Sequence, residues 1–193
     1  MPPTQSSASQ PKPERISDWE FSPDDRLFFD TNIWILLLGI QGSPSDTDVQ
    51  VYSSAYKRIL KAKSVILTDA LVLAEFANAT LHLRYELEMQ FPGDAPQFSS
   101  YKNFRESEFF ADHAWAVGEY LSEIRAQTQI LSVEPPDDWA TLSASFQTGA
   151  RDFNDEMIAL QCRRQNAILV TNDRDFKGAG IRILSHNSKY FRR

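Results

Sequence analysis

Short apolar runs alternate along the chain with longer segments in which apolar residues recur every three or four positions. The short runs are rich in β-branched and aromatic side chains and predict strands at residues 26–29, 64–68, 130–133, 167–171 and 181–184. The longer segments have helical spacing and predict helices over residues 31–38, 47–62, 70–88, 101–127, 138–146 and 154–165. Buried strands that alternate with helices are typical of a mostly parallel central sheet with helices on both faces. We therefore expect an α/β domain, with residues 181–184 as its edge strand.

Polar residues at the ends of these segments indicate where the helices begin. Thr31 or Asn32 can cap the first helix, which Gly39 would end. Asp69 can cap the strongly apolar helix over residues 70–88, and Asp152 is best explained as the cap of the last helix.

The predicted domain is flanked by polar segments. Residues 1–20 are rich in Pro, Ser and Gln, and we expect them to form a disordered arm. The domain itself should cover residues 25–185, with an extra segment near residues 86–103 that contains the loop-like stretch FPGDAPQFSS. Residues 186–193 form a short tail.

Composition and charge exclude several classes of protein. A hydrophobic fraction of 42% with 13 Phe can fill a core, and the longest apolar run, residues 33–40, is too short to cross a bilayer. The N-terminal segment lacks the apolar core of a signal peptide. A single cysteine, Cys162, argues against a disulfide framework or a cysteine-based zinc site, so we expect a cytoplasmic protein. The net charge of −6 argues against a broad basic face for nucleic acid.

Four carboxylates occupy unusual places in this pattern. Asp30 and Asp173 directly follow apolar strands, and ligands of parallel sheets bind beyond the carboxyl ends of the strands. Glu75 is the only charge in the apolar stretch ALVLAEFA, and Asp155 lies at the start of a helix with an apolar inward face. Taken singly, each has a simpler explanation: a helix cap or turn for the aspartates, a buried salt bridge for Glu75.

Together the four acids are harder to explain in this way, because two strand ends and two helices would bring them to one edge of the sheet. Carboxylates so placed repel one another unless protons or cations intervene. Oxygen ligands without His or Cys select hard cations such as Mg²⁺ or Mn²⁺. Such ions activate water and stabilise the leaving oxygen of a phosphodiester, so the pattern points to hydrolytic chemistry.

Three segments carry a resemblance to a known family: FFDTNIW, LVLAEFANA and DEMIALQCRRQNAILVTNDRDF. The chain resembles the PIN-domain family, and within it the toxin ribonucleases of the VapC type. The resemblance implies a Rossmann-like fold in which Asp30, Glu75, Asp155 and Asp173 bind Mg²⁺ or Mn²⁺ and carry catalysis. Asn32 and Thr171 would match the polar groups that hold the site in order. The implied activity is metal-dependent endoribonuclease cleavage of RNA, with an antitoxin protein as partner and a homodimer as the usual assembly.

Other functions remain open at this point. A non-toxin RNA-processing nuclease would carry the same acids, and a PIN-fold binding protein with a weak or silent site would explain the acidic charge. A phosphatase of the haloacid dehalogenase kind would need a second Asp where Asn32 stands, and a dinucleotide-binding fold would need a glycine-rich turn. We expect no catalytic role for His82, His113 or His186, and core packing for Trp34. Phe91, Phe98 and Tyr101 could stack on bases if exposed.

Overall fold

The computed structural model describes residues 10–91, 98–134, 136–137, 139–149 and 151–192. In this part of the chain, six strands form one sheet in the order β1–β6–β5–β2–β3–β4, and every neighbouring pair is parallel. The strands are β1 (Glu14–Arg15), β2 (Arg26–Phe29), β3 (Val65–Asp69), β4 (Gln129–Leu131), β5 (Ile168–Val170) and β6 (Arg182–Ser185). The predicted α/β class and parallel sheet are confirmed.

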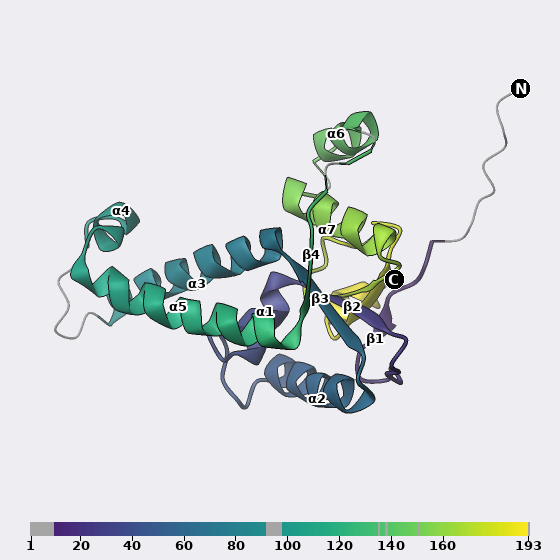
Figure 1. Cartoon of the computed structure of the whole chain (residues 1–193), viewed down its shortest axis with the longest axis horizontal. Helices are drawn as coiled ribbons and strands as arrows, with labels where there is room; N and C mark the ends of the chain where they lie inside the picture. The colour runs from purple at the N-terminus through teal and green to yellow at the C-terminus, as the bar shows by residue number, and fades with distance from the viewer. Residues whose placement is uncertain (1–9, 92–97, 135, 138, 150, 193) are drawn as a thin grey trace, which may run out of the picture.

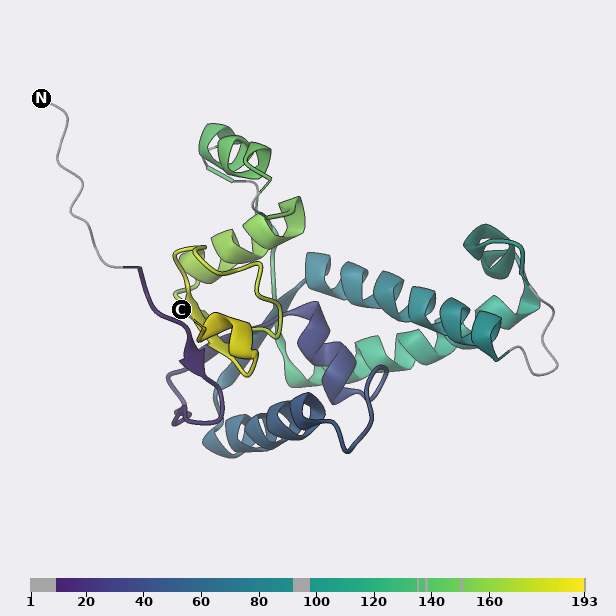
Figure 2. The same cartoon turned by 180° about the vertical axis from the view of Figure 1, so that it is seen from behind.

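The helices that connect these strands pack around the sheet. They are α1 (Thr31–Leu37), α2 (Thr47–Ala62), α3 (Ala70–Gln90), α4 (Tyr101–Arg105), α5 (Glu108–Gln127), α6 (Trp139–Gln147) and α7 (Phe153–Arg164), with a short 3-10 helix over Ser188–Tyr190. Helices α2 and α7 lie on opposite sides of the strands (Figure 1). Helices α3 and α5 run side by side away from the sheet and carry α4 at their far end, whereas α6 projects beside α7 (Figures 1 and 2).

The core lies where the central strands meet the first and third helices. Phe28 on β2, Leu67 on β3 and Leu169 on β5 are completely buried, because these strands have neighbours on both sides and helices above and below. Phe76 of α3 packs into the same cluster. Their burial removes apolar surface from water and is the main force that holds the strand ends, and therefore the site, in place.

Two of the predicted boundaries are wrong. Residues 101–127 form two helices instead of one, because the chain leaves the helix at Glu106 and Ser107 begins α5. The Ser107 hydroxyl donates to the Phe104 carbonyl oxygen at 2.7 Å, a local bond that competes with continued helix. The first helix is capped by Asp30, which accepts from the Thr31 backbone N–H, and neither Thr31 nor Asn32 is the cap.

The N-terminal segment also differs from the expectation. Residues Glu14–Arg15 form β1 beside β6, so residues 181–184 do not lie at the edge of the sheet. Ile16 is buried in the core, and Arg58 donates to its carbonyl oxygen at 2.7 Å. The expected disordered arm therefore does not extend through residues 14–16. Residues 1–9 lie outside the described part of the chain, as do residues 92–97 of the expected loop.

None of the described helices combines the length and the apolar character that crossing a bilayer requires.

Candidate functional site

Asp30 is held at the junction of the two central strands. Phe29 of β2 pairs with Val170 of β5, so the residues that follow them, Asp30 and Thr171, emerge together at the carboxyl edge of the sheet. The Thr171 hydroxyl donates to Asp30 Oδ2 at 2.6 Å, and the Thr31 backbone N–H donates to Asp30 Oδ1 at 2.7 Å. With only 5% of its surface exposed, the carboxylate is fixed in position from both strands.

Asn32 connects this carboxylate to the loop after β5. Its amide nitrogen donates to Asp30 Oδ2 and, at 3.2 Å, to the Thr171 hydroxyl. Its amide oxygen accepts the Asn172 backbone N–H at 3.0 Å. The Thr171 hydroxyl in turn accepts the Asp173 backbone N–H at 2.9 Å. The two residues predicted to support the site, Asn32 and Thr171, thus make contacts that orient Asp30 and the backbone of Asp173.

The other three acids reach the same edge from different elements. Glu75 lies on the second turn of α3, which begins directly after β3, and is half-buried. Asp155 lies in the first turn of α7 and is half-buried, whereas Asp173, in the loop after β5, is exposed. Asp152 caps α7 as expected by accepting the Asp155 backbone N–H at 2.8 Å.

Burial and mutual repulsion raise the pKa values of Asp30, Glu75 and Asp155. Desolvation raises the pKa of Asp30 to about 6, and the negative charges of Glu75 and Asp173 add to the increase. Desolvation and the charges of Asp152, Asp30 and Asp173 raise the pKa of Asp155 to about 7. The pKa of Glu75 is also raised, by desolvation and then by Asp152 and Asp173. The four predicted acids therefore form one electrostatic cluster.

In the described part of the chain, basic side chains do not compensate the charge of this partly buried cluster. Within the described residues, no Lys or Arg forms an ion pair with Asp30, Glu75, Asp155 or Asp173. Buried acids that repel one another without a basic partner are a favourable place for a divalent cation.

The oxygen atoms that the four acids offer as ligands suit a hard divalent cation. All the acidic donors are carboxylate oxygens, which Mg²⁺ and Mn²⁺ prefer. Among the residues that the structure describes, however, no three His, Cys, Asp or Glu side chains stand close enough together to form a ready-made metal cage. Mg²⁺ does not need one, because it keeps several waters and is usually held by one or two carboxylates.

Sequence reasoning missed several groups that support the site. Asn172 donates from its side chain to Asp48 at 3.0 Å, and its amide oxygen accepts from the Tyr52 hydroxyl at 3.1 Å. The same hydroxyl lies 3.0 Å from the Thr171 carbonyl oxygen, so its single hydrogen is shared between these two acceptors, and it accepts the His186 backbone N–H at 2.9 Å. Helix α2 therefore holds the ends of β5 and β6 in place. Asn172 lies within the quoted TNDRDF pattern, and Tyr52 carried no signal beyond its place on an apolar helix face.

Most of the aromatic residues considered for base stacking pack against other side chains. Trp34 is buried in the core, as expected, and Phe98 is buried against Phe104. Tyr101 stacks on His82 with ring centroids 3.8 Å apart, at the junction of α3 and α4. These rings are engaged in packing, which leaves Phe91, 75% exposed, as the free one of those considered.

Comparisons with known proteins agree with the observed fold. The family model described as "PIN domain" matches residues 27–181, which include all four acids. A solved structure of VapBC2 from Rickettsia felis, bound to a DNA fragment from its promoter, contains a chain that is similar in fold. That chain superposes with a TM-score of 0.54 at 17% sequence identity, and the match covers 83% of this chain and 98% of the other. No curated protein gave a significant match.

Proposed function

Because the chain belongs to the PIN-domain family, we propose that it is a metal-dependent endoribonuclease that hydrolyses phosphodiester bonds in RNA. PIN domains are generally nucleases that use divalent metals, and the four acids lie within the matched region. The observation that carries the proposal is the electrostatic cluster itself. Asp30 is buried and oriented by donors that follow both central strands, and its burial, with the negative charges of Glu75 and Asp173, raises its pKa.

The side chains of such a site would have two roles, to bind the cation and to orient Asp30. Asp30, Glu75, Asp155 and Asp173 would hold Mg²⁺ or Mn²⁺, directly or through water, and a bound ion would supply an activated water and charge stabilisation at the phosphate. Asn32 and Thr171 keep Asp30 in one rotamer through the hydrogen bonds described above. Their contribution is to fix the carboxylate before any cation arrives, which lowers the cost of binding.

The test is cleavage of a mixed, structured RNA pool by the wild-type protein and by Asp30→Asn, with Mg²⁺ or Mn²⁺ and with EDTA. We expect cutting that requires the cation and disappears in Asp30→Asn, because loss of one central carboxylate disturbs cation binding while leaving the core packed. Intact cutting by folded Asp30→Asn would refute the assignment of the site. Absence of cutting by the folded, cation-loaded wild type would favour a PIN-fold binding protein instead.

We further propose that the protein is the toxin of a toxin–antitoxin pair, acts in the cytoplasm and assembles as a homodimer. Support for the antitoxin partner comes from the structural neighbour, a VapBC2 complex bound to promoter DNA. Expression of the wild type should arrest growth, expression of Asp30→Asn should not, and the product of a neighbouring small reading frame should relieve the arrest. If active protein leaves growth unaffected, the alternative is an RNA-processing nuclease with the same acids.

A further inference from the structure

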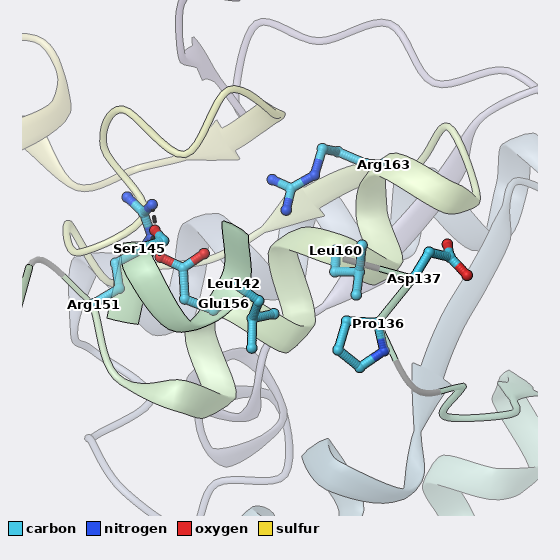
Figure 3. Close-up of a pocket in the computed structure, with 8 residues that line it drawn as sticks. All are labelled: Pro136, Asp137, Leu142, Ser145, Arg151, Glu156, Leu160 and Arg163. Carbon is cyan, nitrogen blue, oxygen red and sulfur yellow. Dashed lines mark hydrogen bonds and ion pairs between the residues drawn. The ribbon is translucent and has the colours of Figure 1, made fainter. Parts of the chain in front are cut away.

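A cavity lies between α6 and α7, beside the acid cluster and separate from it. Its volume is about 410 Å³, a size that suits a small ligand. Leu142 of α6 and Leu160 of α7 form apolar walls, and Pro136 adds to them from the segment before α6. Figure 3 shows a polar group, Ser145 with Arg151 and Glu156, at one end of the cavity and Pro136 near the other.

Exposed aromatic rings border the same two helices. Trp139 and Phe146 of α6 and Phe153 of α7 are 56%, 45% and 39% exposed. The rings of Trp139 and Phe153 are nearly parallel, 14° apart with centroids separated by 6.3 Å, and Phe146 meets Phe153 edge-on at 6.0 Å. Trp139, Leu142 and Phe146 recur with helical spacing, so the rings and the cavity wall share one face of α6. Large flat rings clustered on a surface are typical of binding sites.

The polar end of the cavity offers a hydrogen-bond acceptor. Glu156 is only 3% exposed, and Oε1 of its carboxylate accepts from the Ser145 hydroxyl at 2.6 Å and from two nitrogens of Arg151 at 2.9 and 2.8 Å. The described residues provide no donor for Oε2. A carboxylate held in this way, whose Oε2 accepts from none of the described residues, favours a ligand that carries an N–H group.

Helix α7 links this cavity to the acid cluster. Phe153 and Glu156 are three residues apart and share one face of the helix, whereas Asp155 lies between them in the same turn and points to another side. The cavity and the acid cluster therefore lie on different sides of the same turn of α7.

We propose that the cleft between α6 and α7 binds an unpaired base of the RNA substrate, and prefers a base that carries an amino group. The inference rests on the proposed ribonuclease function. The exposed rings supply the stacking surface that single-stranded RNA uses, and Glu156 Oε2 accepts from the amino group of adenine, cytosine or guanine. Uracil is disfavoured because its one N–H lies between two carbonyl oxygens, which the carboxylate repels.

Binding of labelled single-stranded oligonucleotides of A, of C and of U, measured by fluorescence anisotropy in EDTA, tests the proposal without any cleavage. The wild type should bind the A and C oligonucleotides several-fold more tightly than the U oligonucleotide. Trp139→Ala should weaken binding of A and C by about tenfold, because one stacking partner is lost. Trp115→Ala is the matched control, since it removes an indole that is 70% exposed on α5; its binding should equal that of the wild type.

Two further variants separate the cavity from the rings. Leu160→Phe adds bulk to the cavity wall and should weaken binding of A and C without removing a polar contact. Glu156→Gln, checked for folding by circular dichroism, should reduce the preference for A and C over U. Equal binding by Trp139→Ala and the wild type would overturn the proposal, as would equal affinity for the three oligonucleotides or an equal loss in Trp115→Ala.

The proposal of a base-binding cleft and the proposal of a nuclease can fail independently of each other. A protein that binds A and C through Trp139 but cuts no RNA would uphold the cleft and overturn the nuclease. A protein that cuts RNA while Trp139→Ala binds and cuts like the wild type would overturn the cleft alone. If Trp139→Ala keeps RNA binding but loses binding of the purified antitoxin, the cleft is a protein interface and the proposal is wrong.

Discussion

The charge on Asp30 should lower the stability of the cation-free protein at neutral pH. Asp30→Asn removes this charge, so a comparison with the wild type should reveal the lost free energy of unfolding. Burial raises the pKa of Asp30 from an ordinary 3.8 to about 6. In the unfolded chain the carboxyl loses its proton near pH 4, whereas in the folded protein it holds the proton to a higher pH. The folded state therefore binds more protons between these two values, and its free energy of unfolding falls as the pH rises through this window.

The size of the effect follows from the pKa difference. A difference of about 2 units corresponds to a loss of about 3 kcal/mol once both states are ionised, at 1.36 kcal/mol for each unit. Between pH 4.5 and pH 7.5 about 2 kcal/mol of this should be lost, because part of the change lies at lower pH. Asp30 is 95% buried, so solvent screens the effect only weakly.

Urea denaturation at both pH values, in EDTA, measures the effect. As the pH rises from 4.5 to 7.5, the free energy of unfolding of the wild type should fall by about 2 kcal/mol more than that of Asp30→Asn. The exposed Asp24, replaced by Asn, controls for the loss of one negative charge. If the two proteins lose the same stability over this range, or if Asp30→Asn loses more, then the pKa of Asp30 is not raised in the folded protein and the repulsive cluster does not exist.

Three further results are expected. Mg²⁺ or Mn²⁺ should raise the Tm of the wild type at pH 7.5, by the equivalent of about 2.7 kcal/mol at a hundredfold excess over Kd, and differential scanning fluorimetry should find no such rise in Asp30→Asn. Tyr52→Phe should cost about 1–2 kcal/mol in urea denaturation, because the Thr171 carbonyl oxygen and the backbone after β6 lose a partner. An unchanged midpoint would show that α2 does not hold these strand ends. Arg151→Met should cost about 3–5 kcal/mol because it leaves the Glu156 carboxylate buried without a basic partner, and the double variant Arg151→Met/Glu156→Leu should cost less; equal costs in this double-mutant cycle would refute the expected role of the ion pair.

Much of the fold was predictable because local patterns and tertiary structure agree. The apolar face of residues 47–62 predicts α2 with its observed bounds, and the turn after it is completed by Lys63 in the left-handed region, at φ 59°. The strand ends at Asp30 and Thr171 were likewise predictable, since buried apolar runs in parallel sheets end where polar residues begin. These two features suffice to place the candidate site.

The errors have physical reasons. The helical spacing of residues 101–127 is unbroken by Gly or Pro near the observed junction, and Ser107 alone, a residue that caps helices and also occurs within them, marks where α5 begins. Strand β1 has two residues, too few for any periodicity, and the burial of Ile16 and the contacts of Arg58 hold it in place. Such tertiary contacts leave no local signal.

The candidate acids and two of their supporting residues, Asn32 and Thr171, could be predicted from the sequence, whereas the rest of the supporting network could not. The charge of Glu75 in an apolar helix and the position of Asp30 after a strand are visible in the sequence. The hydrogen bonds of Asn172 join residues more than a hundred positions apart, so they depend on sheet register that only the fold provides. The cleft between α6 and α7 could not be predicted from the sequence for the same reason, because Trp139 and Phe153 belong to different helices.

We propose that the four carboxylates at the end of this sheet hold a divalent cation for hydrolysis of RNA. Anomalous scattering from crystals grown with Mn²⁺, at a concentration that supports cleavage, would locate the cation. We expect an anomalous peak within the cluster of Asp30, Glu75, Asp155 and Asp173, and loss of that peak in Asp30→Asn. A wild-type crystal with no peak at this cluster, or with its Mn²⁺ bound elsewhere, would refute the proposed metal site.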